Sequence, residues 1–232
     1  MHKHDIMSCT FDLKSLLIFT GGVDGTIFGW NYETKFARHE LHLHDPTCTS
    51  ENFIADSKSV DALVIMEKKR LLISMSADQM IRFWDLEELQ AHKPPVFKFH
   101  AGHINPAADE QLTGLAITQE NDRIVTTDTS GRIKMFNIAN VDFRNANLTH
   151  EQKLVQVSNP WYINAHREII YSVEIVEQRD DVFEEDSEDE QIELPEGLAP
   201  EERQPWPDLF VLTASQDKDI LLHRLSNGVK IG

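Results

Sequence analysis

The chain has 232 residues, 41% of them hydrophobic and 8% aromatic, which is enough for a packed core and excludes a wholly disordered protein. Its formal net charge is −17, so we expect neither a nucleic-acid surface nor a surface for anionic membranes. Cys9 and Cys48 provide no disulfide framework, the longest apolar runs are too short to span a membrane, and residues 1–5 lack the apolar region of a secretory signal. These features predict a soluble intracellular protein.

Four segments of the chain align without gaps, at residues 20–30, 74–84, 126–136 and 213–223. Each begins with a hydroxyl residue and has a turn residue four places on, an isoleucine seven places on and a ring residue ten places on. The residues at these positions are Thr20, Asp24, Ile27 and Trp30; Ser74, Asp78, Ile81 and Trp84; Thr126, Ser130, Ile133 and Phe136; and Thr213, Asp217, Ile220 and His223. Repetition of this kind is typical of proteins built from stacked structural units.

Each aligned segment is predicted to form a β-hairpin. An apolar run precedes the turn, and a run that alternates with a period of two follows it, as at residues 81–84. Asp24-Gly25 and Ser130-Gly131 are hairpin turn signals. Further strands are predicted upstream of three hairpins and between units, which makes four strands per unit; they include residues 60–66, 112–118, 169–176, 96–100 and 153–157.

The unit resembles a WD40 repeat, and four-stranded units of this kind imply the blades of a β-propeller. Trp84-Asp85 matches the dipeptide that names the repeat, and Gly102-His103 resembles its upstream Gly-His. In that family a buried network joins this His, the hairpin hydroxyl, the turn Asp and the Trp. The resemblance implies a network made of Thr20, Asp24, Trp30, Ser74, Asp78, Trp84, His103, Thr126, Phe136, His166, Thr213 and Asp217. No unit has the complete set, because His223 takes the Trp position in the fourth unit and Ser130 the Asp position in the third.

We therefore expect an all-β fold of about four four-stranded blades, at residues 1–45, 56–101, 110–160 and 166–232. WD-type propellers most often have more than four blades. The expected structure is an incomplete, open propeller, and the chain is either part of a longer protein or completed by another chain or segment. The alternative is a distorted ring of four blades.

Some details resemble the large WD-repeat proteins of motile cilia, which carry two propellers in one chain. They are residues 21–27 with Trp30, residues 126–134 with Phe136, and residues 228–232. This resemblance implies a scaffold that binds other proteins of the axoneme. Its expected location is the ciliary axoneme or elsewhere in the cytoplasm. The alternative is a regulatory module such as a ubiquitin-ligase substrate receptor. That class often has Trp-Asp-x-Arg, whereas Glu87 follows Leu86 here.

An acidic, Pro-containing insertion at residues 178–207 is predicted to be disordered within the last blade. It is either a solvated spacer, a docking strip for a basic partner, or a phosphorylation target at Ser187, which has acidic residues at the next three positions. Its acidic residues lack the spacing of a calcium-binding loop.

Five histidines outside the repeat positions were weighed as metal ligands. His42 and His44 share one face of a strand with His39 nearby, but a zinc site needs three or four ligands. A polar edge strand explains the pattern equally well. The same interpretation is given to His2 and His4 at the start of the chain.

Trp161 and Trp206 lie outside the repeat positions and are predicted to be either loop anchors or partner-facing residues. The chain has no Gly-rich phosphate loop, no Gly-x-Ser-x-Gly turn and no His-Glu-x-x-His helix. We therefore predict no catalytic residue, no cofactor and no metal, and a protein that is not an enzyme.

Overall fold

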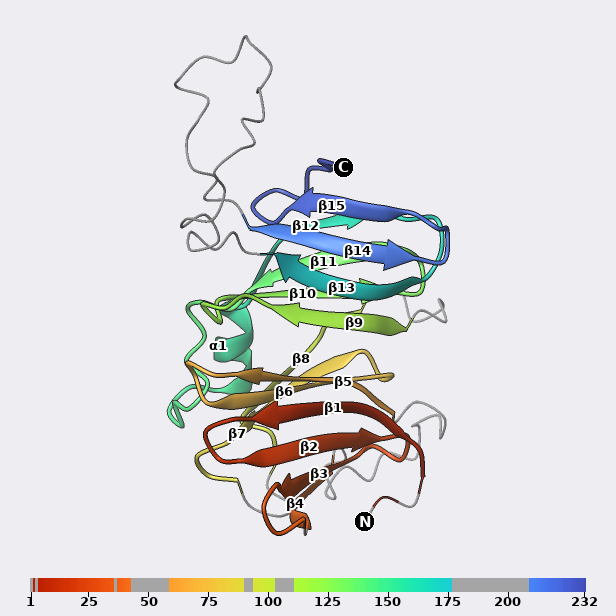
Figure 1. Cartoon of the computed structure of the whole chain (residues 1–232). Coiled ribbons are helices and arrows are strands. Elements are labelled where there is room, and N and C mark those ends of the chain that lie inside the picture. Colours follow the sequence, from red (N-terminus) through yellow and green to blue (C-terminus); the bar gives the residue numbers. More distant parts are fainter. Residues whose placement is uncertain are drawn as a thin grey trace, which may run out of the picture.

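The computed structural model describes residues 2, 4–35, 37–42, 59–89, 94–102, 111–176 and 209–232. These residues form four separate antiparallel sheets that lie one above another in chain order (Figure 1). Within each sheet, strands that follow one another in the chain are hydrogen-bonded neighbours. The sheets correspond to the four repeat units and are called blades one to four.

The strands of blades one to three have the following bounds. Blade one consists of β1 (Ile6–Asp12), β2 (Leu17–Gly22), β3 (Thr26–Asn31) and β4 (Ala37–His42). Blade two consists of β5 (Val60–Met66), β6 (Leu71–Ser76), β7 (Met80–Asp85) and β8 (Phe97–His100). Blade three consists of β9 (Leu112–Ile117), β10 (Arg123–Asp128), β11 (Arg132–Asn137) and β12 (Ser158–Asn164).

Blade four has three strands among the described residues, where four were expected: β13 (Ile170–Val176), β14 (Phe210–Ser215) and β15 (Ile220–Arg224). The last residues of the chain turn back along β15. The Arg224 amide donates to the Val229 carbonyl at 2.9 Å, the Ile231 amide donates to the Leu222 carbonyl at 2.8 Å, and a bridge joins His223 to Lys230. The last residues of the chain therefore pair with the outer edge of this blade.

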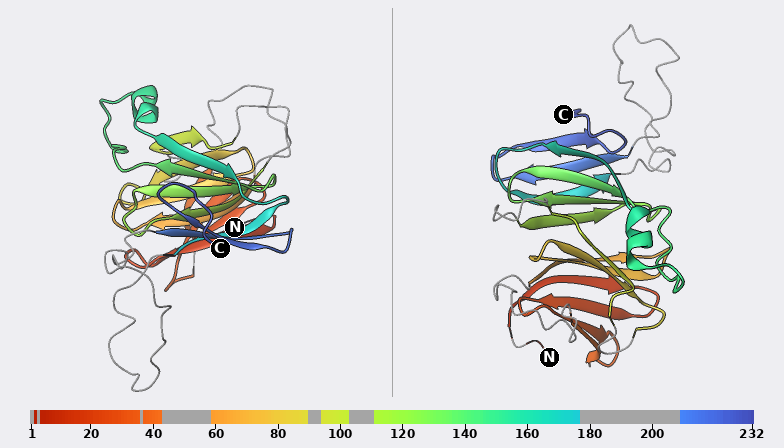
Figure 2. Two further views of the ribbon diagram at one scale, coloured as in Figure 1. Left: turned by 90° about the horizontal axis from the view of Figure 1, so that it is seen from above. Right: turned by 180° about the vertical axis from the view of Figure 1, so that it is seen from behind.

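The strand predicted at residues 153–157 is wrong, because this segment forms part of helix α1 (His150–Val155). Thr149 caps the helix: its hydroxyl accepts from the Gln152 amide, and the Gln152 side chain accepts from the Thr149 amide. The outer strand of blade three, β12, follows the helix. Viewed from behind, α1 lies at the side of the stack of blades (Figure 2).

The hydrophobic core is divided among three clusters, each of which joins two neighbouring blades. We call the face of a blade toward the next blade its leading face and the opposite face its trailing face. Between blades one and two, for example, Leu17 and Phe19 of blade one pack with Leu63 and Trp84 of blade two. The period-two alternation of the strands supplies apolar side chains to both faces, so each blade is stabilised by its neighbours.

Two arginines also tie neighbouring blades together. Arg70 donates to both carboxylate oxygens of the buried Asp12 at 2.7 Å, and Arg144 donates to those of Asp85 at 2.7 and 2.8 Å. The hydrogen bonds from Arg70, which outweigh the effect of burial, lower the pKa of Asp12 from 3.8 to about 2. Arg144 also donates to the Arg70 carbonyl at 3.2 Å, so residues of blades one, two and three are linked in series.

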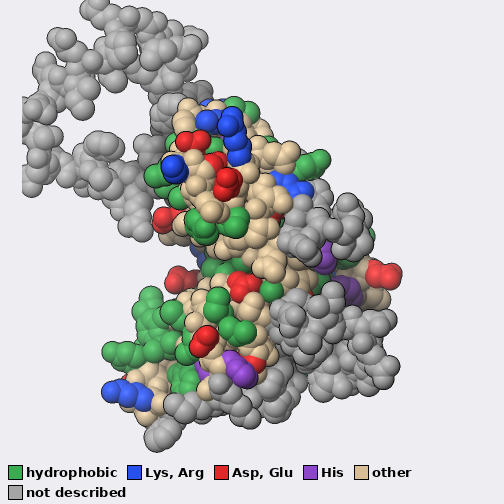
Figure 3. Space-filling view, turned by 90° about the vertical axis from the view of Figure 1, so that its right-hand side faces the viewer, with side chains coloured by type: hydrophobic (Ala, Val, Ile, Leu, Met, Phe, Trp, Pro, Cys, Tyr) green, Lys and Arg blue, Asp and Glu red, His purple; other side chains and the backbone are tan. Residues whose placement is uncertain are grey.

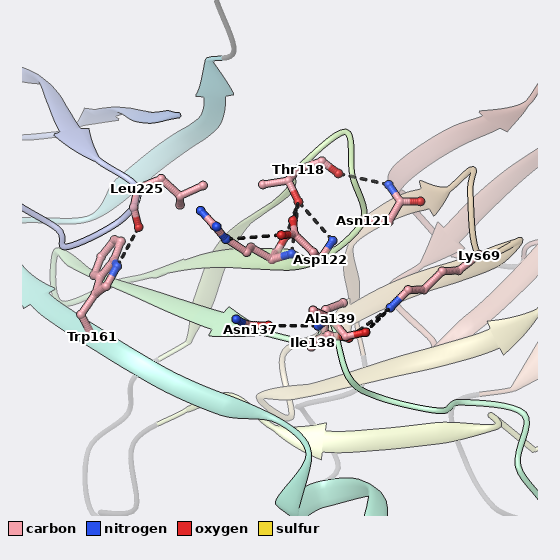
Figure 4. Close-up of polar contacts among 10 residues, drawn as sticks. Lys69, Thr118, Asn121, Asp122, Asn137, Ile138, Ala139, Trp161 and Leu225 are labelled. Atoms are coloured by element: carbon pink, nitrogen blue, oxygen red, sulfur yellow. Dashed lines mark hydrogen bonds and ion pairs between the residues drawn. The ribbon is translucent and has the colours of Figure 1, made fainter. Parts of the chain in front are cut away.

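Blades two and three are joined by further polar contacts, of which the one between Lys69 and Ile138 is drawn in Figure 4. Lys69 Nζ donates to the Ile138 carbonyl at 3.1 Å, and the Lys68 amide donates to Asn121 Oδ1 at 2.9 Å. Between blades three and four, Trp161 Nε1 donates to the Leu225 carbonyl at 2.9 Å (Figure 4). Trp161 is thus an anchor between blades, although it lies in β12 and not in a loop.

Blade one and blade four lie at opposite ends of the stack, and the sheets do not close into a ring (Figures 1 and 2). The predicted all-β, open propeller is confirmed, and a distorted closed ring of four blades is wrong. No helix in the described part of the chain is both long and apolar enough to cross a membrane.

Candidate interaction surfaces

In blade two the repeat network is built from a hydroxyl, an indole and an ion pair. The buried Trp84 donates from Nε1 to Ser74 Oγ at 2.9 Å, which links β7 to β6. Asp78 accepts from the Met80 amide at 3.0 Å and from the Arg82 guanidinium at 3.1 Å. Arg82 is thus the cationic partner of the turn carboxylate in the blade for which the sequence offers no histidine.

In blade four a histidine connects the hairpin hydroxyl to the turn carboxylate. His166 Nε2 lies 2.9 Å from Thr213 Oγ1, and His166 Nδ1 lies 3.0 and 3.1 Å from the two oxygens of Asp217. Desolvation opposes the ionisation of Asp217, but hydrogen bonds from the Arg167 and Asp219 amides and from His166 outweigh it and lower its pKa to about 2. The network therefore holds a charged carboxylate at the hairpin turn.

His223 occupies the tryptophan position of blade four and changes the network there. Its ring is buried, and its Nδ1 atom has no hydrogen-bond partner among the described residues. Burial, together with the neighbouring His166 and Lys230, lowers the pKa of His223. Blade four therefore buries an imidazole whose pKa is lowered, where blade two buries an indole that donates to the hydroxyl.

Blade one has a histidine in its network that the sequence interpretation missed. His2 Nε2 lies 2.8 Å from Thr20 Oγ1, which also accepts from Trp30 Nε1 at 2.6 Å, and Asp24 accepts from the Thr26 amide at 3.0 Å. The sequence analysis did not place His2 in the repeat network, and this contact with Thr20 does. The available signal was its position, four residues before the first strand of its blade, as for His166 in blade four.

Blade three lacks both the indole and the turn carboxylate of the usual network, because Phe136 and Ser130 take their positions. Phe136 has no donor, and Thr126 Oγ1 is buried with no hydrogen-bond partner among the described residues. Asp128, which the sequence interpretation also missed, accepts from the Ser130 and Arg132 amides at 3.0 Å each. Asp128 therefore supports the turn at which Ser130 replaces the usual carboxylate.

His103 and Ser187 lie outside the described residues, as do the insertion at residues 178–207 and His44. Among the residues that the structure describes, no group of three or more His, Cys, Asp or Glu side chains could hold a metal ion.

A cavity of about 560 Å³ lies at the hairpin-turn end of blade four. Its lining includes Arg167, Lys218 and Lys230, together with Glu168 and Asp219. Figure 3 views the turn side of the molecule, where basic and acidic side chains lie close together over blade four at the top. A lining with both charges suits a polar peptide segment better than a ligand of one charge.

The leading face of blade four differs from the leading faces of the other blades. The isoleucine seven places into each aligned segment is fully buried in blades one to three, as Ile27, Ile81 and Ile133. In blade four the same position, Ile220, is 68% exposed. Three blades therefore have a neighbour on this face, and blade four has none among the described residues.

The trailing face of blade one shows the converse difference. We call the first strand of each blade (β1, β5, β9 and β13) its innermost strand. The first residue of this strand is 0% exposed in blade two (Val60), 4% in blade three (Leu112) and 0% in blade four (Ile170). In blade one this residue is Ile6, which is 55% exposed. Hydrophobic side chains over blade one are visible at the bottom of Figure 3. The arc thus has two apolar end faces.

Comparison with known proteins agrees with this architecture. The family model "WD domain, G-beta repeat" matches residues 1–31. The human protein "WD repeat-containing protein 18" is 28% identical over 93 residues, which make up 40% of this chain and 22% of that protein.

Solved structures that are similar to the chain include "Crystal structure of RRP9 WD40 repeats" (TM-score 0.63) and "Structure of U3-55K" (TM-score 0.62), each at 15% identity. The chain is covered completely in both matches and spans 51% and 52% of those chains, respectively. The computationally designed Ika8 protein matches with a TM-score of 0.57 at 15% identity, over 99% of this chain and 48% of that chain. The chain therefore spans about half the length of the solved propellers it matches.

The chain therefore has the fold of a WD40-type β-propeller with its blades in an open arrangement, and its first 31 residues match the WD40 repeat model. WD40 repeats form scaffolds for protein–protein interaction, and the family is generally non-catalytic.

Proposed function

We propose that the chain is a non-catalytic scaffold that binds other proteins, and that its open propeller is completed by blades that lie against its two end faces. The observation that carries the proposal is the contrast between Ile220, which is largely exposed, and its three buried counterparts. Apolar surface that is buried in every internal interface is left in water at the ends, and covering it is favourable.

The cavity at the turn end of blade four is proposed as a second contact, for a polar segment of a partner protein. Loops and turns on a rigid scaffold commonly carry binding residues. Here the network of His166, Thr213 and Asp217 holds the turn, and Asp217, Lys218 and Asp219 of this turn line the cavity. A partner with both acidic and basic side chains would match this lining.

The titratable residues of the described region support a structural role. Asp12 and Asp85 bind arginines of neighbouring blades, and Asp217 binds His166 and two backbone amides. Their charges are used to hold strands and turns, so we propose no catalytic step.

We further propose that this scaffold belongs to the ciliary axoneme. The support is the sequence resemblance of residues 21–30, 126–136 and 228–232 to the double-propeller proteins of motile cilia. The alternative, a substrate receptor of a ubiquitin ligase, has less support. Glu87 occupies the position where that class often has arginine, and Asp85 is bound by Arg144.

The test is affinity capture with mass spectrometry from ciliated and non-ciliated cells. Three baits are compared: the unaltered chain, Ile220→Glu on the end face, and the cavity variant Lys218→Glu. Val155→Glu, on the exposed side of α1, is the matched control because Val155 is also apolar and exposed but lies away from both surfaces.

We expect a set of proteins, axonemal ones among them, that is retained by the control and lost with one of the surface variants. If no protein depends on either surface, the scaffold proposal is wrong. If ubiquitin-ligase adaptors are captured in place of axonemal proteins, the ciliary placement is wrong.

A further inference from the structure

The three internal interfaces of the propeller follow one rule. Each joins the buried isoleucine on the leading face of one blade to the first residue of the innermost strand of the next. Ile27 packs in one cluster with Val60, Ile81 in one cluster with Leu112, and Ile133 in one cluster with Ile170. These pairs come from equivalent positions, because the hairpin registers of the four blades coincide.

At the two ends of the arc, one member of such a pair is exposed on each face. Ile220 is the leading isoleucine of blade four, and Ile6 is the first residue of the innermost strand of blade one. The two residues are the complementary halves of a fourth pair. They cannot meet within one chain, because blades one and four lie at opposite ends of the stack (Figure 1).

A second pair of equivalent positions, those of Asp12 and Arg70, is occupied by apolar residues at both ends of the arc. At the interface between blades one and two, Asp12 ends the innermost strand and binds Arg70, the residue before β6. In blade four the position of Asp12 is taken by Val176, which pairs with Phe210 as Asp12 pairs with Leu17. In blade one the position of Arg70 is taken by Leu16, and both have a φ of 53°. Where the interface between blades one and two has the ion pair of Asp12 and Arg70, the end faces thus have Val176 and Leu16. These two apolar side chains are 41% and 39% exposed, respectively.

We infer that each end face binds the opposite end face of a second copy of this chain, so that two copies close head to tail into one ring of eight blades. The inference rests on the proposed role of the end faces as interaction surfaces and names their partner. A contact of blade four with blade one of the other copy brings Ile220 to Ile6 and Val176 to Leu16. Two such contacts, related by a two-fold axis, bury all four end faces.

The two exposed end faces favour a second copy over one additional blade. One blade would cover only one of the two end faces of the chain, whereas a second copy covers both. Eight blades lie within the range of known propellers, and a head-to-tail contact forms a ring when its rotation closes.

The first experiment measures the mass of the full 232-residue chain by size-exclusion chromatography with light scattering. We expect a species of twice 26.6 kDa at micromolar concentration. Ile220→Glu and Ile6→Glu should each shift it to a single copy, while Val155→Glu, at an exposed position on α1, should not. Circular dichroism verifies that each variant is folded. A wild-type monomer, a variant that remains dimeric, or a mass that keeps growing with concentration would overturn the closed ring.

The second experiment tests the orientation of the two copies with a disulfide. Cys9 is exposed in blade one at the position that Leu63 holds in blade two, and Leu212 of blade four corresponds to Phe19 of blade one. Because Leu63 and Phe19 share one cluster, Leu212→Cys should form a covalent two-copy species with Cys9 on oxidation. Cys48, which lies outside the described residues, is replaced by serine in this background. Adding Cys9→Ser should abolish the cross-link; a cross-link that persists would exclude this orientation.

The two proposals can be told apart. A chain that is monomeric, but whose capture of a cellular protein is abolished by Ile220→Glu, would refute the second-copy inference and leave the proposed function intact. A monomeric chain whose captured proteins depend on neither surface would refute both.

Discussion

Blade two and blade four are built from the same aligned repeat segment but have different surroundings. Blade two has a neighbour on each face, and both Ile81 and Trp84 are buried. Blade four has blade three on its trailing face, where His223 is buried, whereas Ile220 on the leading face is largely exposed. Equivalent residues of one repeat therefore contribute differently to stability, because burial depends on the neighbouring blade.

The polar networks of the two blades differ in the same way. In blade two an indole donates to the hairpin hydroxyl of Ser74, and an arginine holds the turn carboxylate. In blade four one histidine contacts both the hydroxyl of Thr213 and the carboxylate of Asp217. Different residues can thus satisfy the same buried hydroxyl, so the absence of one motif residue does not mean that the network is broken.

The largest expected effect is the difference in stability loss between Ile81 and Ile220, the isoleucines on the leading faces of blades two and four. Ile81→Ala should lower the free energy of unfolding by about 2–5 kcal/mol, because it leaves a cavity between two blades. Ile220→Ala should lower it by less than about 0.5 kcal/mol at concentrations too low for two copies to associate, since exposed positions contribute little. Urea denaturation measures both values. Equal losses would mean that blade four is covered by a neighbour in the isolated chain.

The second-largest effect on stability is expected from the ion pair of Asp12 and Arg70, between blades one and two. Asp12→Asn removes the charge that binds Arg70 and should lower the free energy of unfolding by about 2 kcal/mol, a value that follows from the lowered pKa. The matched control is Glu120→Gln: Glu120 pairs with Lys68 at the surface, where both side chains are more than half exposed, and its loss should cost at most about 1 kcal/mol.

The same pair predicts a pH dependence. The pKa of Asp12 in the folded chain, about 2, lies below its ordinary value of 3.8. Its contribution is therefore fully present above pH 3.8 and is lost as the pH falls toward 2. In acid titration the difference in stability between the unaltered chain and Asp12→Asn should be constant above pH 3.8 and should shrink as the pH falls toward 2. Parallel curves throughout would show that the pair contributes nothing.

A smaller difference is expected between the hydroxyls of blades two and three. Ser74→Ala should cost about 1–3 kcal/mol, because it leaves the buried Nε1 of Trp84 without its acceptor. Thr126→Val should be neutral or stabilising by about 1 kcal/mol, since Thr126 Oγ1 has no partner among the described residues. Thermal denaturation compares the two. A large loss for Thr126→Val would indicate that His103 contacts this hydroxyl.

The smallest effect concerns the hairpin turn of blade four. Lys218 has a φ of 73°, in the left-handed region, where blades one and three have Gly25 and Gly131. Lys218→Gly should raise the free energy of unfolding by about 0.5–1 kcal/mol by removing the strain of a side chain at positive φ. The converse change, Gly131→Ala, should destabilise, because its Cβ would lie 2.3 Å from the His166 carbonyl oxygen. A destabilised Lys218→Gly variant would contradict this account.

Most of the fold could be predicted from local patterns. Period-two runs and turn signals located the hairpins, because strands and tight turns depend on residues close together in the chain. The segment at residues 153–157 was mispredicted because the capping box at Thr149 and Gln152 outweighs its apolar residues. His2 was missed because it contacts its hairpin from outside the aligned segment, and Asp128 because it lies two places before the position of the turn carboxylate in the repeat.

The sequence alone therefore determined the repeat, the all-β class and the hairpin turns, which follow from residue type and spacing within about eleven positions. Only the tertiary structure decided which repeat residues are covered. Ile81 and Ile220 are the same amino acid at the same position of the repeat, yet one is buried and the other is exposed. The physical reason is that burial is a property of two packed blades, and the pattern within one blade contains no information about whether a second blade is present.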